Sequence, residues 1–176
     1  KDVAEEARRF LALPHPEPAK TRAPTDSTSG AAPGSPEASR RLFAMAQPIH
    51  GTLAETYLRG RAITSLSGTA ALRYHPRCYY RPNEHAPTEI RPAMVAAVTD
   101  LTGHQTGAHR TWLAPDGSGK APVETPRRAM GDLLGHAVRF GNAGVVLAAG
   151  EGIETVLSPR QVLPKMPMLA ALSAAH

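Results

Sequence analysis

The spacing of apolar and polar residues predicts a chain that is helical at first and rich in strands afterwards. Residues 2–12 place apolar side chains on one face of a short helix, with acidic residues at its N-terminal end. A second helical stretch lies at 38–46, and Thr52 with Glu55 forms a capping-box pattern for a third helix that stops near Gly60. We therefore expect three short helices before the first strand.

The second part of the chain favours strands. Segments 71–75, 93–99 and 106–113 are predicted as strands, and the turn at 100–103 joins the last two into a hairpin. Residues 127–134 are predicted as a helix or a turn. These segments indicate an antiparallel sheet in the middle of the chain.

The last third of the chain alternates strand, helix and strand. Residues 144–149 form a short apolar run, typical of a buried strand in a parallel sheet. Residues 154–163 read as a helix interrupted by Pro159, and 166–172 as a second buried strand. This order predicts a βαβ unit, so the expected fold class is α/β: an α+β module followed by a partial Rossmann-like βαβ.

Positive charge is concentrated in the middle of the chain. Residues 38–143 carry 13 basic and 7 acidic groups, and 12 of those basic groups are arginine. Arginine binds phosphate through two parallel hydrogen bonds and stacks on bases, so this bias suits a polyanion. A basic surface without a partner is the alternative, and charge alone favours neither.

The remaining composition narrows the class of protein. Residues 13–37, rich in proline and small polar residues, predict a mobile linker behind the helix of residues 1–12. The single cysteine excludes a disulfide framework and a cysteine-rich zinc site within this stretch. Since no membrane span or signal pattern is present, we expect a cytoplasmic protein without membrane contact. A start at Lys1 and an apolar end at His176 suggest a fragment of a longer chain.

An acidic residue between two glycines follows the strand at 144–149. Glu151 would stand at the carboxyl end of a parallel strand, the edge where ligands bind in open α/β sheets. Gly150 and Gly152 would let a substrate backbone come close. The alternative is an acid placed favourably at a helix N-terminus, and the spacing alone favours that alternative.

The segment Val145–Leu157 resembles the first motif of the Toprim domain, which bacterial-type primases, type IA and type II topoisomerases and some nucleases share. The resemblance implies that Glu151 acts in general acid/base chemistry or positions a metal, and that Gly152 is the glycine that follows this acid. Thr155 falls where many primases have an acid, so the chain departs from the primase pattern at this position. Residues 167–173 resemble the second Toprim strand and its turn.

The region before this motif resembles the module that precedes Toprim in plasmid- and phage-type primases. The resemblance covers residues 38–176 and implies a module over 38–143, followed by an incomplete N-terminal part of Toprim over 144–176. A zinc ribbon would lie in an upstream domain, and a helicase is a further partner or domain in such proteins. The segments that carry the resemblance are Tyr57–Arg61, Leu72–Pro76, Arg91–Val95, Gly107–Leu113, Lys120–Val123 and Arg127–Gly131.

A set of basic and aromatic residues in this module is the candidate site for nucleic acid and nucleotides. Arg110 and Trp112 are two residues apart on one strand face, and an arginine beside an aromatic ring suits a single strand. For Trp112, a place in the core is equally compatible with the pattern. The resemblance implies that the set holds template or nucleoside triphosphate; its members are Arg110, Trp112, Lys120, Arg127 and Arg128.

The implied function is that of a DNA primase, which joins nucleoside triphosphates on a single-stranded DNA template during replication of plasmids, phages or other mobile elements. It implies Mg²⁺ or Mn²⁺ held by Glu151 and a later Asp-x-Asp pair. No such pair follows Glu151 here, so we expect an incomplete metal site and no polymerisation by this chain alone. Two alternatives stay open: a non-catalytic Toprim-like DNA-binding module of a helicase or mobilisation protein, and a Toprim nuclease.

Overall fold

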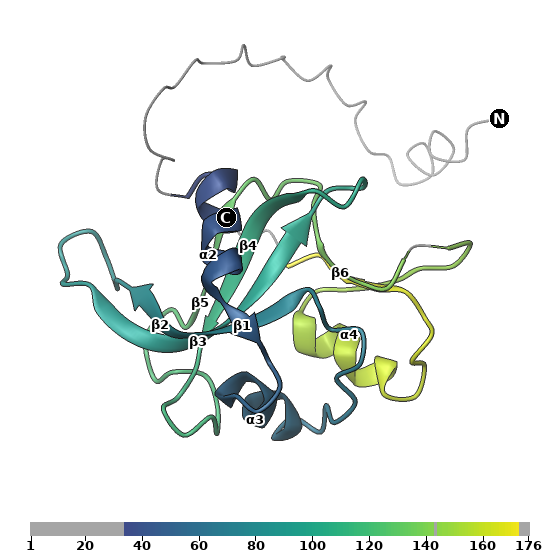
Figure 1. Cartoon of the computed structure of the whole chain (residues 1–176), viewed down its shortest axis with the longest axis horizontal. Helices are drawn as coiled ribbons and strands as arrows, with labels where there is room; N and C mark the ends of the chain where they lie inside the picture. Colours follow the sequence, from purple (N-terminus) through teal and green to yellow (C-terminus); the bar gives the residue numbers. More distant parts are fainter. Residues whose placement is uncertain (1–33, 143, 173–176) are drawn as a thin grey trace, which may run out of the picture. The chain divides into compact units, whose positions relative to one another are not determined.

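The computed structural model describes residues 34–142 and 144–172, which belong to one compact unit spanning residues 31–176. The helix predicted for residues 1–12 lies outside the described residues, as does most of the linker predicted for 13–37. The fold is a mixed α/β arrangement dominated by an antiparallel sheet (Figure 1). No helix in the described part of the chain is long and apolar enough to cross a membrane.

The main sheet has five antiparallel strands in the order β1-β2-β3-β4-β5. The predicted hairpin is confirmed as β3–β4, in which Ala96 lies opposite His109. The strand expected at 71–75 is confirmed and continues to Tyr80 through an irregularity between His75 and Cys78. The strands are β1 Gln47–Pro48, β2 Leu72–Tyr80, β3 Glu89–Thr99, β4 Gln105–Trp112 and β5 Arg127–Gly131.

The prediction of a helix or turn over residues 127–134 is wrong, because β5 pairs with β4 at the edge of the sheet. Gly131 ends this strand opposite Gly107 and has a φ of 91°. A Cβ on Gly131 would come within 2.5 Å of the Thr106 carbonyl oxygen. The close approach of the two strands therefore depends on glycine at this position.

Two helices flank the main sheet. α2 (Pro36–Met45) packs against β3, β4 and β5. α3 (Leu53–Arg59) starts after Thr52, whose hydroxyl accepts a hydrogen bond from the Ala54 N–H at 3.2 Å. The Glu55 carboxylate accepts a second hydrogen bond from the Gly51 N–H, directly before the cap, at 2.6 Å. The predicted capping by this Thr/Glu pair is thus confirmed.

A second, three-stranded sheet follows in the order β6-β8-β7. β7 and β8 are parallel and α4 connects them, so the predicted βαβ unit is confirmed. β6 pairs antiparallel with β8 and comes from the N-terminal side of the predicted domain boundary at residue 143. The elements are β6 Val138–Phe140, β7 Ala148–Gly150, α4 Ile153–Arg160 and β8 Met168–Ala170.

The strand expected over residues 144–149 forms only at its end. Val145, Val146 and Leu147 are exposed rather than buried. β7 is an edge strand whose only partner, β8, is three residues long. Among the described residues, no element covers this apolar run.

Separate buried clusters lie on the two faces of the main sheet. The larger contains Leu58, Phe140 and Leu157, and packs α3, α4 and the small sheet against one face. The smaller contains Tyr80 and Trp112, and Leu42 of α2 packs against it. Strand alternation assigns neighbouring residues to different faces, so it also decides which side chains can meet in a site.

In the described part of the chain, one β-bridge links the two sheets in addition to their shared core. Thr99 pairs antiparallel with Ala137, through N···O distances of 2.9 and 3.2 Å. The Arg139 guanidinium reinforces the link by donating to the Thr99 carbonyl and, at 3.0 Å, to the Thr99 hydroxyl. This link sets β6 of the small sheet beside the end of β3, the central strand of the main sheet.

Candidate functional site

A pocket of about 260 Å³ lies between two walls of different origin. β4 and β5 supply a basic wall, and the turn from β7 into α4 supplies a wall with two carboxylates. We call it the Glu151 pocket. It is lined by His109, Arg127, Arg128, Ala129, Leu133, Glu151, Gly152, Ile153, Glu154 and Leu172.

Glu151 directly follows β7, at the carboxyl end of a strand parallel to β8, where the sequence predicts it. Its side chain is exposed, and it makes no hydrogen bond or ion pair within the described ranges 34–142 and 144–172. Its carbonyl oxygen accepts a hydrogen bond from the Leu172 N–H at 2.8 Å. The backbone is thus held in place while the carboxylate lines the pocket with no protein partner.

The two glycines beside Glu151 differ in what they permit. A Cβ on Gly150 would lie 2.7 Å from Val156 Cγ1, so α4 occupies the space predicted for a substrate backbone. Thr155 also contacts this position, with its Cγ2 at 3.6 Å. A Cβ on Gly152 would come no closer than 3.4 Å to the Thr155 hydroxyl. Since Gly152 lines the pocket, the close approach of a ligand there stays a prediction.

Glu154 is the most strongly engaged group in the pocket. The Tyr57 hydroxyl donates to its carboxylate, and Lys120 Nζ lies 4.0 Å from the same oxygen. The Arg61 guanidinium lies over the Tyr57 ring, 5.0 Å from its centroid. Burial acts to raise the pKa of Glu154, but the Tyr57 hydrogen bond, the backbone amide at the helix start and the Lys120 and Arg61 charges lower it overall. Glu154 is therefore an ionised structural anchor.

The Glu154→Gln variant tests this anchor. We expect it to lower the free energy of unfolding by about 2 kcal/mol, because a charge-assisted hydrogen bond is lost and Lys120 loses its counter-charge. Urea unfolding at neutral pH measures the change. Glu84→Gln is the control, because the Glu84 side chain is 85% exposed and pairs with the similarly exposed His85. Equal stability of the two variants would contradict the anchoring role.

His109 presents a neutral imidazole to the pocket. It is half-buried beside β5, and its buried Nδ1 has no hydrogen-bond partner in the described part of the chain. Burial, together with the nearby charge of Arg127, lowers the pKa of His109 to about 4. At neutral pH it can donate or accept a hydrogen bond but carries no charge.

Strand alternation divides the predicted basic set between the two faces of the sheet. On β5, Arg127 lies opposite Thr111 and faces the Glu151 pocket with His109, whereas Arg128 lies opposite Arg110. Lys120 joins the first group through Glu154. The set predicted as one surface is therefore two groups on opposite faces of the sheet, although Arg128, on the edge strand β5, also lines the Glu151 pocket.

Trp112 belongs to the core. Its side chain is only 1% exposed, and its ring meets that of Tyr80 edge to face, with centroids 4.9 Å apart. Base stacking on this ring, one of the two sequence interpretations, is incompatible with such burial. Trp112 instead supports the Arg110 guanidinium, which lies 5.0 Å from its ring centroid.

Sequence reasoning misses two residues of the pocket, His109 and Glu154, together with Tyr57, which bonds to Glu154. Tyr57 and Glu154 are 97 residues apart, and no periodicity connects them. Glu154 lies three residues after Glu151, so its place in the first turn of the predicted helix is the one local signal for it. His109 lies between an alanine and an arginine, and this local pattern carries no signal for a pocket residue.

The described residues do not fit a divalent cation by themselves. Within residues 34–142 and 144–172, no group of three or more His, Cys, Asp or Glu side chains could hold a metal ion. Glu154 is already bonded to Tyr57 and paired with Lys120, which leaves Glu151 as the free carboxylate of the pocket. Mg²⁺ prefers several oxygen ligands, so a bound cation would need ligands beyond Glu151.

The fold and pocket define a basic mixed α/β module with a carboxylate at the end of a parallel strand. The chain belongs to a family described as Domain of unknown function (DUF7146), whose family model matches residues 33–140. The matched range contains the basic wall of the pocket and ends before Glu151. No curated protein and no solved structure matches the chain.

Proposed function

We propose that this chain binds single-stranded DNA and nucleoside triphosphate as part of a Toprim-type DNA primase that acts in the cytoplasm on plasmid, phage or other mobile-element DNA. The observation that supports it is the meeting of Glu151 with Arg127 in one pocket. Both segments that resemble primases, the arginine-rich module and the Glu-Gly motif, contribute to this pocket. A parallel βαβ unit that presents Glu151 agrees with the resemblance to Toprim.

The proposed roles follow from charge and position. Arg127 and Lys120 hold phosphate oxygens, because Arg127 lines the pocket, Lys120 lies 4.0 Å from Glu154 at the carboxylate wall, and arginine pairs with phosphate through two parallel hydrogen bonds. Glu151 accepts the proton of the attacking 3′-hydroxyl, because its carboxylate borders the pocket without a protein partner. Glu154 keeps Lys120 and Tyr57 in place. A metal would need ligands beyond those described.

Primer synthesis tests the role of Glu151. In the protein that carries this chain, we expect Glu151→Gln to lower the rate at least about 100-fold, the usual minimum for losing a general base. Primer length on a single-stranded template with nucleoside triphosphates is the readout. Glu84→Gln, a matched change on the exposed β2–β3 turn, should keep the wild-type rate. Full activity of Glu151→Gln would contradict the assignment of Glu151 as the general base.

A non-catalytic DNA-binding module is the second candidate, and the pairing of Glu154 with Tyr57 and Lys120 favours it, because this carboxylate is engaged in structure rather than open to a substrate. The same preparation separates the two. If wild-type protein binds single-stranded DNA in a salt-dependent way but makes no primer, the binding module is correct. In either case Arg127→Ala should weaken DNA binding and reduce the slope of affinity against salt by about one.

A further inference from the structure

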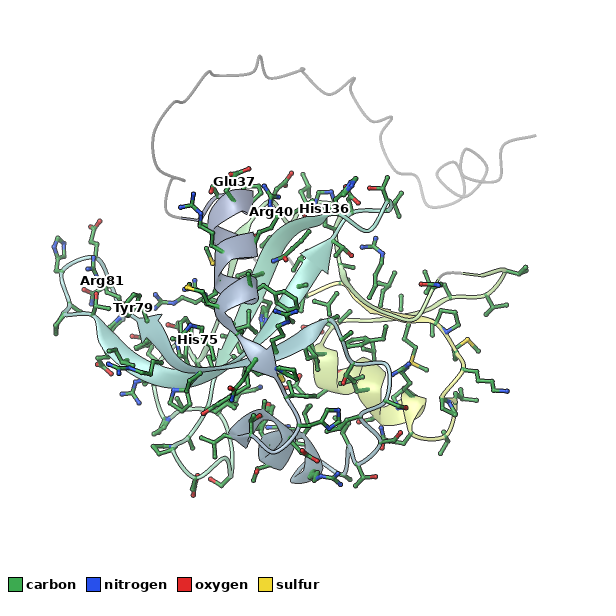
Figure 2. The ribbon with its side chains drawn as sticks, in the orientation of Figure 1. Glu37, Arg40, His75, Tyr79, Arg81 and His136 are labelled. Atoms are coloured by element: carbon green, nitrogen blue, oxygen red, sulfur yellow. The ribbon has the colours of Figure 1, made fainter. Side chains whose placement is uncertain are left out.

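A second cavity, also of about 260 Å³, lies on the face of the main sheet that carries α2. Figure 2 shows Tyr79 and Arg81 near the end of β2, well away from α4. Three arginines border the cavity and no acidic residue does. The residues that matter are Tyr80, Arg81, Thr88, Arg110, Trp112 and Arg128.

Arg110 is a half-buried cation with no hydrogen-bond or ion-pair partner in the described part of the chain. Its Nε is fully buried. Its guanidinium rests over the ring of Trp112. The Tyr80 hydroxyl, also at this cavity, is buried and unpaired too. A buried charge or donor without an acceptor is costly, so native proteins rarely keep one unless a ligand supplies the acceptor.

The other two arginines add charge but are held by protein acceptors. Arg128 donates to the carbonyl oxygens of Arg81 and Pro82, both at 2.6 Å. Arg81 donates to the Thr88 hydroxyl at 3.0 and 3.1 Å. These bonds fix two guanidinium groups in place around Arg110. The cavity thus has a strong positive field and one arginine whose donors are free.

We infer that this cavity binds a phosphoryl group, held by the Arg110 guanidinium and the Tyr80 hydroxyl, as a site separate from the Glu151 pocket. A phosphoryl group supplies up to two negative charges and several acceptor oxygens. It therefore matches a cavity with three positive charges, in which the Arg110 guanidinium has donors free to bind two oxygens at once. A nucleotide and a nucleic-acid strand can both provide it. The two cavities lie on opposite faces of β5 and share only Arg128, so this site does not rest on the proposed function.

Trp112 offers a direct probe, because it is the one tryptophan of the chain and lies under Arg110. Sodium phosphate should change its fluorescence in a saturable way and raise the melting temperature, whereas sodium chloride at equal ionic strength should not. Arg110→Met should weaken phosphate binding at least about tenfold. In phosphate-free buffer the same variant should melt higher than wild type, because the unpaired buried charge is gone.

Arg77→Met is the matched control, since Arg77 is exposed on β2 and borders neither cavity. It should bind phosphate like wild type. Competition by a nucleoside monophosphate, or by an oligonucleotide without a terminal phosphate, identifies the carrier of the phosphoryl group. Wild-type fluorescence that responds to phosphate no more than to chloride would overturn the inference. So would unchanged phosphate affinity in Arg110→Met, or a lower melting temperature of that variant without phosphate.

Discussion

The Gly131→Ala variant should lose about 4 kcal/mol of unfolding free energy, an estimate that adds the left-handed backbone to the collision of the new methyl group. Gly131 has a φ of 91°. Its Cβ would meet backbone atoms of Thr106 and Gly107 at 2.5 and 2.7 Å, and backbone cannot move aside as a flexible side chain can. We expect β5 to detach from β4 and the basic wall of the Glu151 pocket to be lost with it.

The Gly103→Ala variant separates the two causes. Gly103 has a similar φ of 88° in the β3–β4 turn, but nothing lies within 4 Å of its Cβ position. It should therefore lose only about 1 kcal/mol, the backbone part alone. Urea unfolding of both variants measures the difference. Equal losses of unfolding free energy in the two variants would contradict the claim that glycine is needed at position 131 for the close approach of β4 and β5.

Acidification should destabilise the protein through His109 before most carboxylates titrate. The pKa of His109 is lowered to about 4 by burial, from an ordinary value of 6.5. Above pH 6.5 the ring is neutral in both states and the pKa difference has no effect. As the pH falls from 6.5 to 4, His109 binds a proton in the unfolded state but not in the folded state. The free energy of unfolding therefore falls by about 3 kcal/mol.

Unfolding free energies of wild type and His109→Gln, measured across this range, isolate the contribution. The difference between the two proteins should change by about 3 kcal/mol between pH 7 and pH 4. Glu154 affects stability at a lower pH than His109. Its pKa is lowered in the folded state, so its contribution to stability is fully present above the ordinary carboxyl pKa and is lost as the pH drops through the folded-state pKa. Parallel pH profiles of wild type and His109→Gln would show that His109 is not buried neutral.

The elements that sequence patterns could predict are those with a local signal. Thr52 and Glu55 mark the start of α3, and the turn at 100–103 marks the β3–β4 hairpin. The strand–helix–strand order predicts the parallel pair β7–β8. β5 carries no such signal, because apolar and polar residues hardly alternate along it. Its pairing also depends on Gly107, which lies far away in the chain.

The candidate site was predictable only in part, for the same physical reason. Glu151 stands where a strand ends and a helix begins, which local sequence can indicate. The division of Arg127 from Arg128 needs the register of β4 and β5, because neighbouring residues on a strand point to opposite faces. Likewise, the bond between Tyr57 and Glu154 exists only once α3 and α4 pack together.

The bridge between Thr99 and Ala137 has a consequence for the pocket. Arg127 belongs to one sheet and Glu151 to the other, so the pocket exists only while the two sheets keep their relative position. The bridge, the Arg139 hydrogen bonds and the shared buried core together hold that position. A ligand that touches both walls would therefore bind only the fully folded arrangement, and its binding free energy would add to the stability of the whole fold.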